Sequence, residues 1–369
     1  MFFSVIIPVY NRPEPVKFAI QSVLNQTYQD WECIVVDDAS TDCTPQVCAE
    51  LADSDSRIHF YSLSKNGGVS MARNYGLDHI SNREDGYILF LDSDNRLTSN
   101  TMSTLKEVIE KNPVDMVVFA YDQQGLPFEP PYHQMLDRTW IRNRILPQHL
   151  NILPQSAGFL EPYVWNKCYK KTLISDHFIR FDEWRRVWED NAFVIQCLDK
   201  CSEIILIPDN LYETCDYPGI DHLSGHVDAD LFLNYIAGYE KNVEQFSEEY
   251  NYHNNYTPRR FFNVVHGLLI TYYKKCDEKA GYDLLHKLLE NRTMNEWVNQ
   301  IIPANPEERR IVSAFQSGDN LALAQIYHKL SERQSEVKQS AFSWKGKLKQ
   351  RVRKMLGDDK YDRIKQMLS

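Results

Sequence analysis

Two carboxylates stand side by side where a short apolar segment ends. Residues 87–91 are followed directly by Asp92, Ser93 and Asp94. The segment is short, rich in β-prone side chains and preceded by the turn-forming residues 84–86, so it predicts a buried strand. Side chains two residues apart in an extended chain point the same way. We therefore expect Asp92 and Asp94 on one face, with Ser93 turned away.

Neighbouring carboxylates repel one another unless a cation or a hydrogen-bond donor lies between them. Their oxygens suit Mg²⁺ or Mn²⁺, which often bridge a protein carboxylate to the phosphates of a substrate. The alternative is a polar exit from a strand, in which Asp and Asn act as turn residues. This stretch by itself leaves both interpretations open.

Glu189 and Asp190 form a second acidic pair, at the first turn of an amphipathic helix expected over 188–198. Acidic side chains favour helix N-termini because the free amides and the helix dipole attract them. Capping therefore explains one of the two acids without any function.

Strands and helices alternate along the first third of the chain, and these elements must position the acids. Connections of this length indicate a mainly parallel sheet with both faces covered. Ligands of such sheets bind at the carboxyl ends of the strands, and Tyr10, Asp38, Asp92 and Asp94 all follow such ends. This convergence favours a ligand site. The expected strands are 3–9, 31–38, 58–63, 87–91 and 115–121, and the expected helices begin near 13, 44, 69 and 98.

The pattern changes further along the chain. Between Gln123 and Pro162 the periodicity fails and prolines are frequent, which predicts a long loop or lid over the sheet. A short strand is expected over 211–215, and helical spacing runs from about Asp228 to Ser331. We expect a catalytic α/β domain over 1–225, a helical domain over 226–335, and a linker with a basic tail over 336–369.

Bulk properties exclude several classes of protein. The 369 residues are 43% hydrophobic and 25% charged, as in ordinary globular proteins. No apolar run approaches the roughly 20 residues of a membrane span, and the N-terminus lacks the features of a signal peptide, so we expect a cytoplasmic protein. Eight scattered cysteines without a Cys-x-x-Cys pair predict reduced thiols, and the net charge of −10 disfavours nucleic acid as the main partner.

Five ordered motifs resemble the family 2 glycosyltransferases, which have the GT-A fold, a Rossmann-like mixed α/β sheet flanked by helices. The resemblance covers roughly residues 3–215 and is specific because the motifs occur in the family's order. It implies that Asp92-Ser93-Asp94 is the metal-binding Asp-x-Asp and that Glu189-Asp190 carries the catalytic base. The other three motifs are residues 4–11, residues 22–27 followed by 35–42, and residues 66–74.

The resemblance implies a nucleotide-sugar donor, most simply a UDP-sugar. Asp38 would accept a hydrogen bond from the pyrimidine N3–H, a contact that selects uracil or thymine over cytosine. Pro8 and Tyr10 would frame the base, and Arg73 would hold phosphate, order the acids or form a purely structural ion pair. The remaining donor-binding residues that it implies are Asn11, Asn66, Gly67, Asp92 and Ser93.

The same resemblance implies an inverting transfer. Asp94, with Asp92, would bind Mg²⁺ or Mn²⁺ on the donor diphosphate. Asp190 would take the proton of the acceptor hydroxyl, and Glu189 would orient the acceptor or the base. The segment after the last strand departs from the family's pattern. His222 in this segment would be a third metal ligand, a phosphate contact or simply a solvated side chain. The acceptor would be a saccharide or a lipid-linked glycan.

The basic tail predicts where the protein works. Residues 342–369 hold nine basic and three acidic side chains, a net charge of +6 that leaves about −16 for the rest of the chain. A basic amphipathic helix suits the surface of an anionic membrane, where a lipid-linked acceptor would be met. The alternative is a helix packed on the acidic body of the same protein.

Rival functions lack their motifs. An oxidoreductase needs Gly-x-Gly-x-x-Gly after the first strand, where residues 10–14 read Tyr-Asn-Arg-Pro-Glu, and no Walker motif is present. An inactive sugar-nucleotide-binding or scaffold protein would be expected to lack one of Asp38, Asp94 or Asp190. The sequence indicates neither the sugar, the acceptor nor the oligomeric state.

Overall fold

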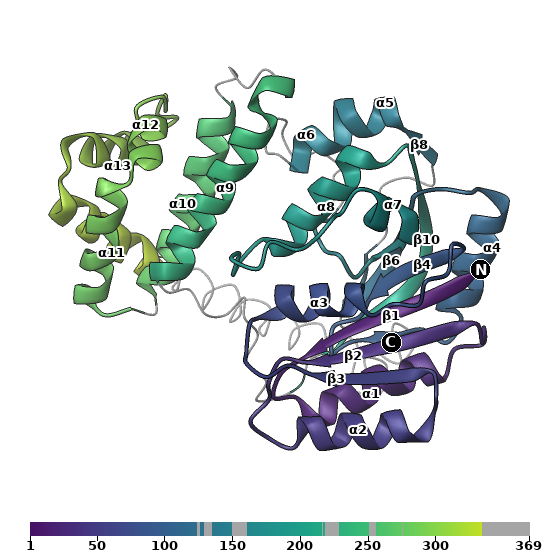
Figure 1. Ribbon diagram of the computed structural model, residues 1–369. Helices are drawn as coiled ribbons and strands as arrows, with labels where there is room; N and C mark the ends of the chain where they lie inside the picture. Colours follow the sequence, from purple (N-terminus) through teal and green to yellow (C-terminus); the bar gives the residue numbers. More distant parts are fainter. Residues whose placement is uncertain are drawn as a thin grey trace, which may run out of the picture. The chain divides into compact units, whose positions relative to one another are not determined.

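The computed structural model describes residues 1–123, 126–128, 135–149, 161–215, 217, 229–250, 256–274 and 276–333 (Figure 1). The described chain divides into two compact units. The first comprises the described residues up to 217 together with 234–250, and the second comprises 229–233 and the described residues from 256 onward. The expected domain boundary near 225, His222 and the expected tail over 336–369 lie outside the described residues.

A 10-stranded mixed sheet forms the centre of the first unit. The strands β3, β2, β1 and β4 are parallel neighbours, whereas β9 pairs antiparallel with both β4 and β6. This confirms the expected mixed, mainly parallel sheet. In spatial order the strands are β3 (Ile58–Ser62), β2 (Trp31–Asp37), β1 (Phe2–Val9), β4 (Gly86–Phe90), β9 (Lys167–Lys170), β6 (Met116–Gln123), β10 (Glu203–Thr214) and β5 (Arg96–Leu97), with β7 (Leu126–Phe128) on β6 and β8 (Met135–Asp137) on β10.

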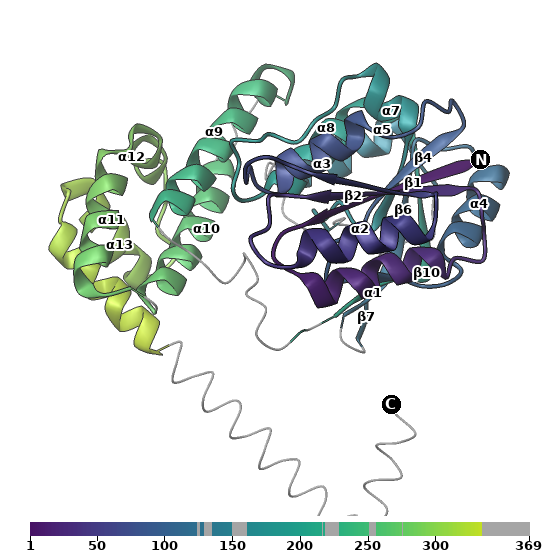
Figure 2. The same ribbon diagram turned by 60° about the horizontal axis from the view of Figure 1, so that its bottom comes forward.

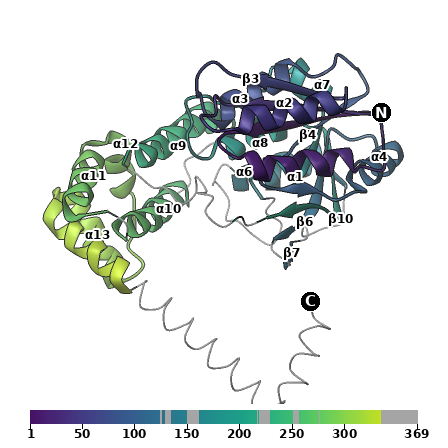
Figure 3. The same cartoon turned by 90° about the horizontal axis from the view of Figure 1, so that it is seen from below.

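Helices cover both faces of this sheet (Figures 1 and 2). One face carries α1 (Pro13–Leu24), α2 (Thr44–Ser54) and α4 (Thr101–Lys111), and the view in Figure 3 looks from the side of α1 and α2. The other face carries α3 (Val69–Asp78), α7 (Lys171–Asp176) and α8 (Glu189–Lys200). Because successive strand side chains alternate between faces, Val5 and Ile7 lie in one core cluster and Ile6 lies in the other.

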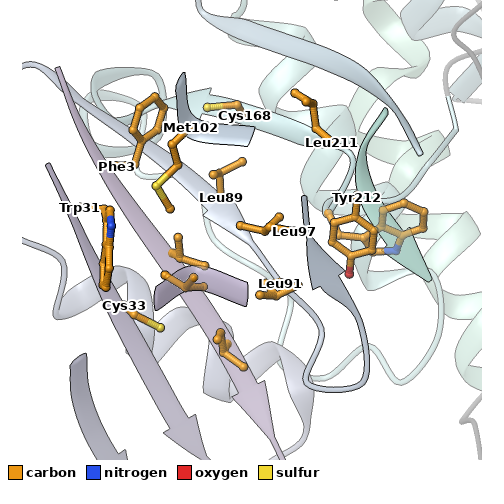
Figure 4. Close-up of a cluster of buried hydrophobic side chains, with 14 of the residues drawn as sticks. Phe3, Trp31, Cys33, Leu89, Leu91, Leu97, Met102, Cys168, Leu211 and Tyr212 are labelled. Carbon is orange, nitrogen blue, oxygen red and sulfur yellow. The ribbon is translucent and has the colours of Figure 1, made fainter. Parts of the chain in front are cut away.

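The core against α1 and α4 is a dense apolar cluster (Figure 4). Phe3, Trp31, Leu89 and Met102 are buried there, and Tyr212 of β10 lies at the side of the cluster. On the opposite face α3 packs unusually close to β1, since a Cβ atom at Gly76 would lie 2.5 Å from Cγ2 of Ile6. The strands therefore fix the position of α3 tightly.

The segment expected to be a loop between Gln123 and Pro162 contains short elements in its described parts. Besides β7 and β8 it forms α5 (Arg138–Trp140), the π-helix η1 (Ile141–Ile145) and α6 (Leu146–His149). Leu136, Ile141 and Leu146 are buried in the same core cluster as α8. The loop prediction was wrong here because these elements are too short to produce a periodic pattern.

Strand β10 also differs from the expectation of a short strand over 211–215. It begins at Glu203, and its pairing with β6 shifts register between Ile207 and Asn210. Pro208 lies at this irregularity, where the missing N–H of proline is tolerated. The predicted strand began after the proline, whereas the observed strand begins before it and passes through a bulge.

The second unit is helical. It contains α10 (Tyr256–Tyr273), α11 (Glu278–Glu290), α12 (Arg292–Val298), α13 (Pro306–Ser317) and a helix at 320–333. Residues 234–250 of the long helix α9 (Ala229–Tyr250) belong instead to the first unit. The helical spacing expected for this region is confirmed. Across the described ranges, none of the helices is both long and apolar enough to cross a bilayer.

Candidate active site

Arg73 joins the two acidic pairs. It lies on α3, and its side chain is only 4% exposed. Its Nη2 donates to Oδ1 of Asp92 at 3.0 Å, and its Nη1 donates to Oδ1 of Asp190 at 2.5 Å. Oε1 of Glu189 lies 3.8 Å from the same Nη1. One buried guanidinium thus brings together a residue that follows β4 and residues that begin α8.

Burial governs the protonation of this group. It raises the pKa of Asp190 above its ordinary value, although Arg73 and the backbone N–H of Val164 act in the opposite direction. Burial, and next the charge of Asp190, raises the pKa of Glu189 as well. Burial would lower the pKa of Arg73, but the three carboxylates raise it above its ordinary value. A carboxylate with a raised pKa is a stronger general base than an exposed one.

Glu189 and Asp190 both lie in the first turn of α8, as the capping interpretation expects, but capping does not account for the contacts of Asp190. Trp188 is the N-cap residue, and its side chain makes no capping hydrogen bond. Trp188 has φ of 60°, a left-handed conformation that a bulky side chain rarely adopts. Asp190 turns its carboxylate to Arg73 and to the N–H of Val164, which lies 3.4 Å from Oδ2. Its orientation therefore suits an active-site role better than a cap.

The Asp92-Ser93-Asp94 motif forms a turn. Strand β4 ends at Phe90, and the carbonyl oxygen of Asp92 accepts from the N–H of Asn95 at 3.0 Å. The alternation of an extended chain therefore does not apply, and the two carboxylates have different partners: Asp92 pairs with Arg73, whereas Asp94 pairs with Arg12. Ser93 is buried beside them.

Arg12 was missing from the residues that the sequence singled out. Its Nη1 donates to Oδ2 of Asp94, and its backbone N–H donates to Oγ1 of Thr44 at 2.9 Å. It follows Asn11, whose φ of 48° turns the chain sharply after β1. A cation directly after the first strand, at the edge where Asp94 was already expected, was the signal available in the sequence.

Two of the expected donor-binding residues, Asn66 and Gly67, contact a third, Asp38. Its Oδ1 accepts from the N–H of Gly67 at 2.8 Å, and its Oδ2 accepts from the N–H of Gly68 at 2.7 Å. Nδ2 of Asn66 donates to the backbone oxygen of Asp38 at 3.1 Å. Burial raises the pKa of Asp38, and the two amides partly oppose that rise. Gly68 has φ of 88°, which suits glycine alone.

The end of β1 supplies the other expected donor-binding residues. Pro8 lies within β1 and pairs with Val36, while the Tyr10 side chain is exposed. Oδ1 of Asn11 accepts from the N–H of Thr41 at 2.8 Å, and its own N–H donates to Oγ of Ser40. These contacts join the loops that follow β1 and β2, so an exposed aromatic ring stands at the strand ends beside Asp38.

The acids after β4 have the chemistry of a divalent-cation site. Carboxylate oxygens are the ligands that Mg²⁺ and Mn²⁺ prefer. Within the described ranges no group of three or more His, Cys, Asp or Glu side chains could hold a metal ion. Asp92 and Asp94 are therefore too few for the roughly six oxygen ligands of Mg²⁺, and donor phosphates would have to complete the set. His222, the third candidate, lies outside the described residues.

A buried lysine fixes the segment that approaches Asp190. Nζ of Lys167 donates to the carbonyl oxygens of Glu161 (2.7 Å) and Tyr163 (2.6 Å) and to Oδ1 of Asn166 (2.7 Å). Burial lowers the pKa of Lys167 to about 7. These bonds hold the turn from which the N–H of Val164 reaches Asp190.

Comparison with known proteins matches residues 4–165 to the family described as glycosyl transferase family 2. The glycosyltransferase GlyG of Streptococcus pneumoniae is 29% identical over 57% of this chain and 69% of its own length. The minor teichoic acid biosynthesis protein GgaB of Bacillus subtilis is 38% identical over 52% of this chain and 20% of its own length. The chain therefore spans between a fifth and about two thirds of these curated relatives.

Among solved structures, residues 1–349 of S. aureus TarS in complex with UDP-GlcNAc match with a TM-score of 0.60. The match covers 91% of this chain and 92% of that one at 19% identity. At this identity the likeness shows a shared fold. It extends beyond the sheet, since it includes most of the helical part of the chain.

Proposed function

Residues 4–165 match the family model of glycosyl transferase family 2, and from this match we propose that the chain is an inverting glycosyltransferase. It would move a sugar from a UDP-sugar to a hydroxyl group of a saccharide or lipid-linked acceptor. The observation that carries the proposal is the contact of Arg73 with both Asp92 and Asp190. It brings the donor end of the sheet and the candidate base into one hydrogen-bonded group.

The donor would lie along the carboxyl ends of β1, β2 and β4. Tyr10 offers an exposed ring to a nucleobase, and Asp38 offers carboxylate oxygens at the same edge. Each oxygen of Asp38 accepts one backbone amide, which leaves lone-pair capacity for an N3–H donor. The fold shared with TarS, whose structure holds UDP-GlcNAc, supports a UDP-sugar and makes an N-acetylhexosamine the first sugar to test.

Asp92 and Asp94 are the residues that would hold Mg²⁺ or Mn²⁺ together with the donor diphosphate. When bound, the cation would neutralise the charge that develops on the leaving nucleoside diphosphate. Arg12, which pairs with Asp94, places a second positive charge at the same edge. We propose that its guanidinium turns from Asp94 to a phosphate oxygen when the donor binds, since both partners are oxyanions.

Asp190 would act as the general base. The acceptor oxygen forms a bond to the anomeric carbon while its proton passes to Asp190, and the bond from that carbon to the diphosphate oxygen breaks with its electron pair. Attack from the face opposite the leaving group inverts the anomeric centre. Arg73 keeps Asp190 oriented, and burial keeps the carboxylate basic enough to accept the proton.

The test is donor turnover by the purified full-length chain. We expect release of the nucleoside diphosphate (UDP, or dTDP from dTDP-Rha) from one member of a panel comprising UDP-Glc, UDP-Gal, UDP-GlcNAc, UDP-GalNAc, UDP-GlcA and dTDP-Rha in the presence of Mn²⁺, because transferases commonly leak the donor sugar to water. Exhaustive chelation should abolish that release. A protein that binds a donor in a thermal-shift assay without turning it over would instead be an inactive sugar-nucleotide-binding or scaffold protein.

The predicted cytoplasmic location and the predicted attachment of the tail to an anionic membrane stay predictions from the sequence. They are compatible with a lipid-linked acceptor, and the similarity to a teichoic acid biosynthesis protein makes a cell-surface polymer a reasonable acceptor class.

A further inference from the structure

Three aromatic rings stack between the interior of the first unit and its surface. The rings of Tyr163 and Trp165 are 4.8 Å apart and inclined by 12°, and those of Trp165 and Tyr212 are 4.5 Å apart and inclined by 18°. Tyr121 meets Trp165 edge-on at 4.7 Å. Exposure rises along the stack from 0% at Tyr212 through 8% at Trp165 to 38% at Tyr163. One ring of the stack is therefore exposed at the surface, and the other two rings beneath it are buried.

Both ends of this aromatic stack contact the candidate active site. At the buried end, the hydroxyl of Tyr212 accepts from the N–H of Asp92 at 3.3 Å and from Nδ2 of Asn95 at 3.1 Å. At the exposed end, Val164, the residue after Tyr163, donates its N–H to Asp190. The exposed ring consequently belongs to the residue next to the one that touches the proposed base.

The Tyr163 ring is held rigidly. Its carbonyl oxygen accepts from Nζ of Lys167, and Trp165 covers one of its two faces. A sugar that stacks on this ring would therefore do so on the opposite face. A rigid aromatic ring provides contact area at a low cost in conformational entropy.

We propose that the exposed face of Tyr163 binds a sugar ring of the acceptor by stacking. The inference rests on the proposed function, because it assigns the acceptor side of the same site. The C–H groups on one face of a pyranose carry weak positive charge and are attracted to the negative face of an aromatic ring. Stacked there, the sugar directs its hydroxyl groups outward from its rim, and one of them reaches Asp190.

The test measures saccharide binding apart from turnover. Methyl glycosides of glucose, galactose and N-acetylglucosamine are mixed with the full-length protein and UDP, and saturation-transfer NMR records which sugar protons approach the protein. We expect the strongest saturation on the C–H face of one glycoside. Tyr163→Ala should weaken binding roughly three- to tenfold, whereas Tyr163→Phe, which keeps the ring, should bind like the native chain.

The matched control is Tyr282→Ala, which removes a similarly exposed tyrosine from α11 in the second unit and should change nothing. Thermal denaturation of each variant shows whether it is folded. If Tyr163→Ala is unfolded, Tyr163→Leu replaces it, because it fills the site without an aromatic face.

The outcomes separate this inference from the proposed function. Tyr163→Ala should raise the KM for a glycoside acceptor, whereas Tyr282→Ala should leave that KM and donor hydrolysis in the presence of Mn²⁺ unchanged. Suppose that the native chain hydrolyses a donor, but Tyr163→Ala binds glycosides as well as the native chain does, or no glycoside is saturated at all. Either result would overturn the acceptor subsite and leave the transferase proposal standing. If glycosides bind in a way that depends on the Tyr163 ring but no donor is hydrolysed, the transferase proposal is refuted and the assignment of Tyr163 as a saccharide-binding residue stands.

Discussion

Both carboxylate oxygens of Asp190 have a hydrogen-bond donor. Oδ1 accepts from Arg73 and Oδ2 accepts from the N–H of Val164. The group is thereby oriented within a buried site, and burial still leaves its pKa above the ordinary value. Orientation with retained basicity is what a general base needs, since the carboxylate must be ionised before the acceptor proton arrives.

The substitution Asp190→Asn keeps the shape of this side chain and removes its basicity. We expect transfer to fall by about 10²–10⁴-fold, the usual effect of losing a general base. The KM for the donor should change little, because Asp92 and Asp38 are untouched. Steady-state kinetics with the identified donor measure both values. Transfer within a few-fold of the native rate would mean that another group takes the proton.

The substitution Glu189→Gln tests the electrostatics of the acidic pair. Burial and the charge of Asp190 raise the pKa of Glu189, so the native state holds this proton to higher pH than the unfolded chain does. Ionised Glu189 therefore reduces stability, a loss that develops as pH rises above the ordinary Glu pKa and is complete above the raised one. We expect Glu189→Gln to raise Tm at about pH 8.5 and to leave it unchanged at about pH 4. An equal shift at both pH values would contradict the raised pKa.

At the scale of elements, the close packing of α3 on β1 fixes the position of Arg73 between the two acidic pairs. Gly76 allows this approach, since a Cβ atom there would lie 2.5 Å from Ile6. The loop before α3 adds the amides of Gly67 and Gly68 to Asp38. One helix and its preceding loop thus contribute to both the proposed donor end and the proposed base end of the site.

We therefore expect Gly76→Ala to lower the free energy of unfolding by about 1–3 kcal/mol, the usual cost of overpacking a core. Displacement of α3 should also reduce donor turnover by moving Arg73. The matched control is Gly267→Ala in α10, where a Cβ atom would meet nothing within 4 Å. This substitution should stabilise the helix, because alanine loses less conformational freedom there than glycine does. Urea denaturation of both variants gives the comparison, and equal stabilities would show that α3 can move away from β1 without cost.

Much of the element pattern could be predicted because parallel strands buried on both faces have continuous apolar sequences. The alternation up to residue 123 and the convergence of Tyr10, Asp38 and the Asp92-Ser93-Asp94 motif follow from that pattern. Contacts between distant segments could not be predicted: the pairing of Arg12 with Asp94 and the aromatic stack depend on tertiary packing. The turn at residues 92–95 escaped prediction because its hydrogen bond to Asn95 competes with an extended continuation of β4.

At the scale of the whole molecule, charge is distributed unevenly along the chain. The predicted tail over 342–369 has a net charge of +6, whereas the rest carries about −16. This tail lies outside the described residues, so its basic amphipathic pattern is the sole basis for the expected membrane contact.

Deletion of residues 342–369 should abolish co-sedimentation with vesicles of anionic phospholipid at low salt, because basic side chains near such a surface each contribute roughly 1 kcal/mol of attraction. Transfer to a soluble acceptor should be spared. Vesicles of neutral phospholipid serve as the control. If the full-length protein does not bind anionic vesicles, or if truncation unfolds the first unit, the tail packs on the protein itself and the membrane prediction is wrong.

The configuration of the transferred sugar tests the central claim most directly. A single displacement with Asp190 as base converts the α-linked sugar of a UDP-sugar into a β-linked product without a covalent intermediate. NMR of the isolated product, made with the donor that the panel identifies, reads the anomeric coupling constant. We predict a β linkage for the native chain and loss of product for Asp190→Asn. An α-linked product from a UDP-sugar, or β-linked product formed at the native rate by Asp190→Asn, would contradict the account.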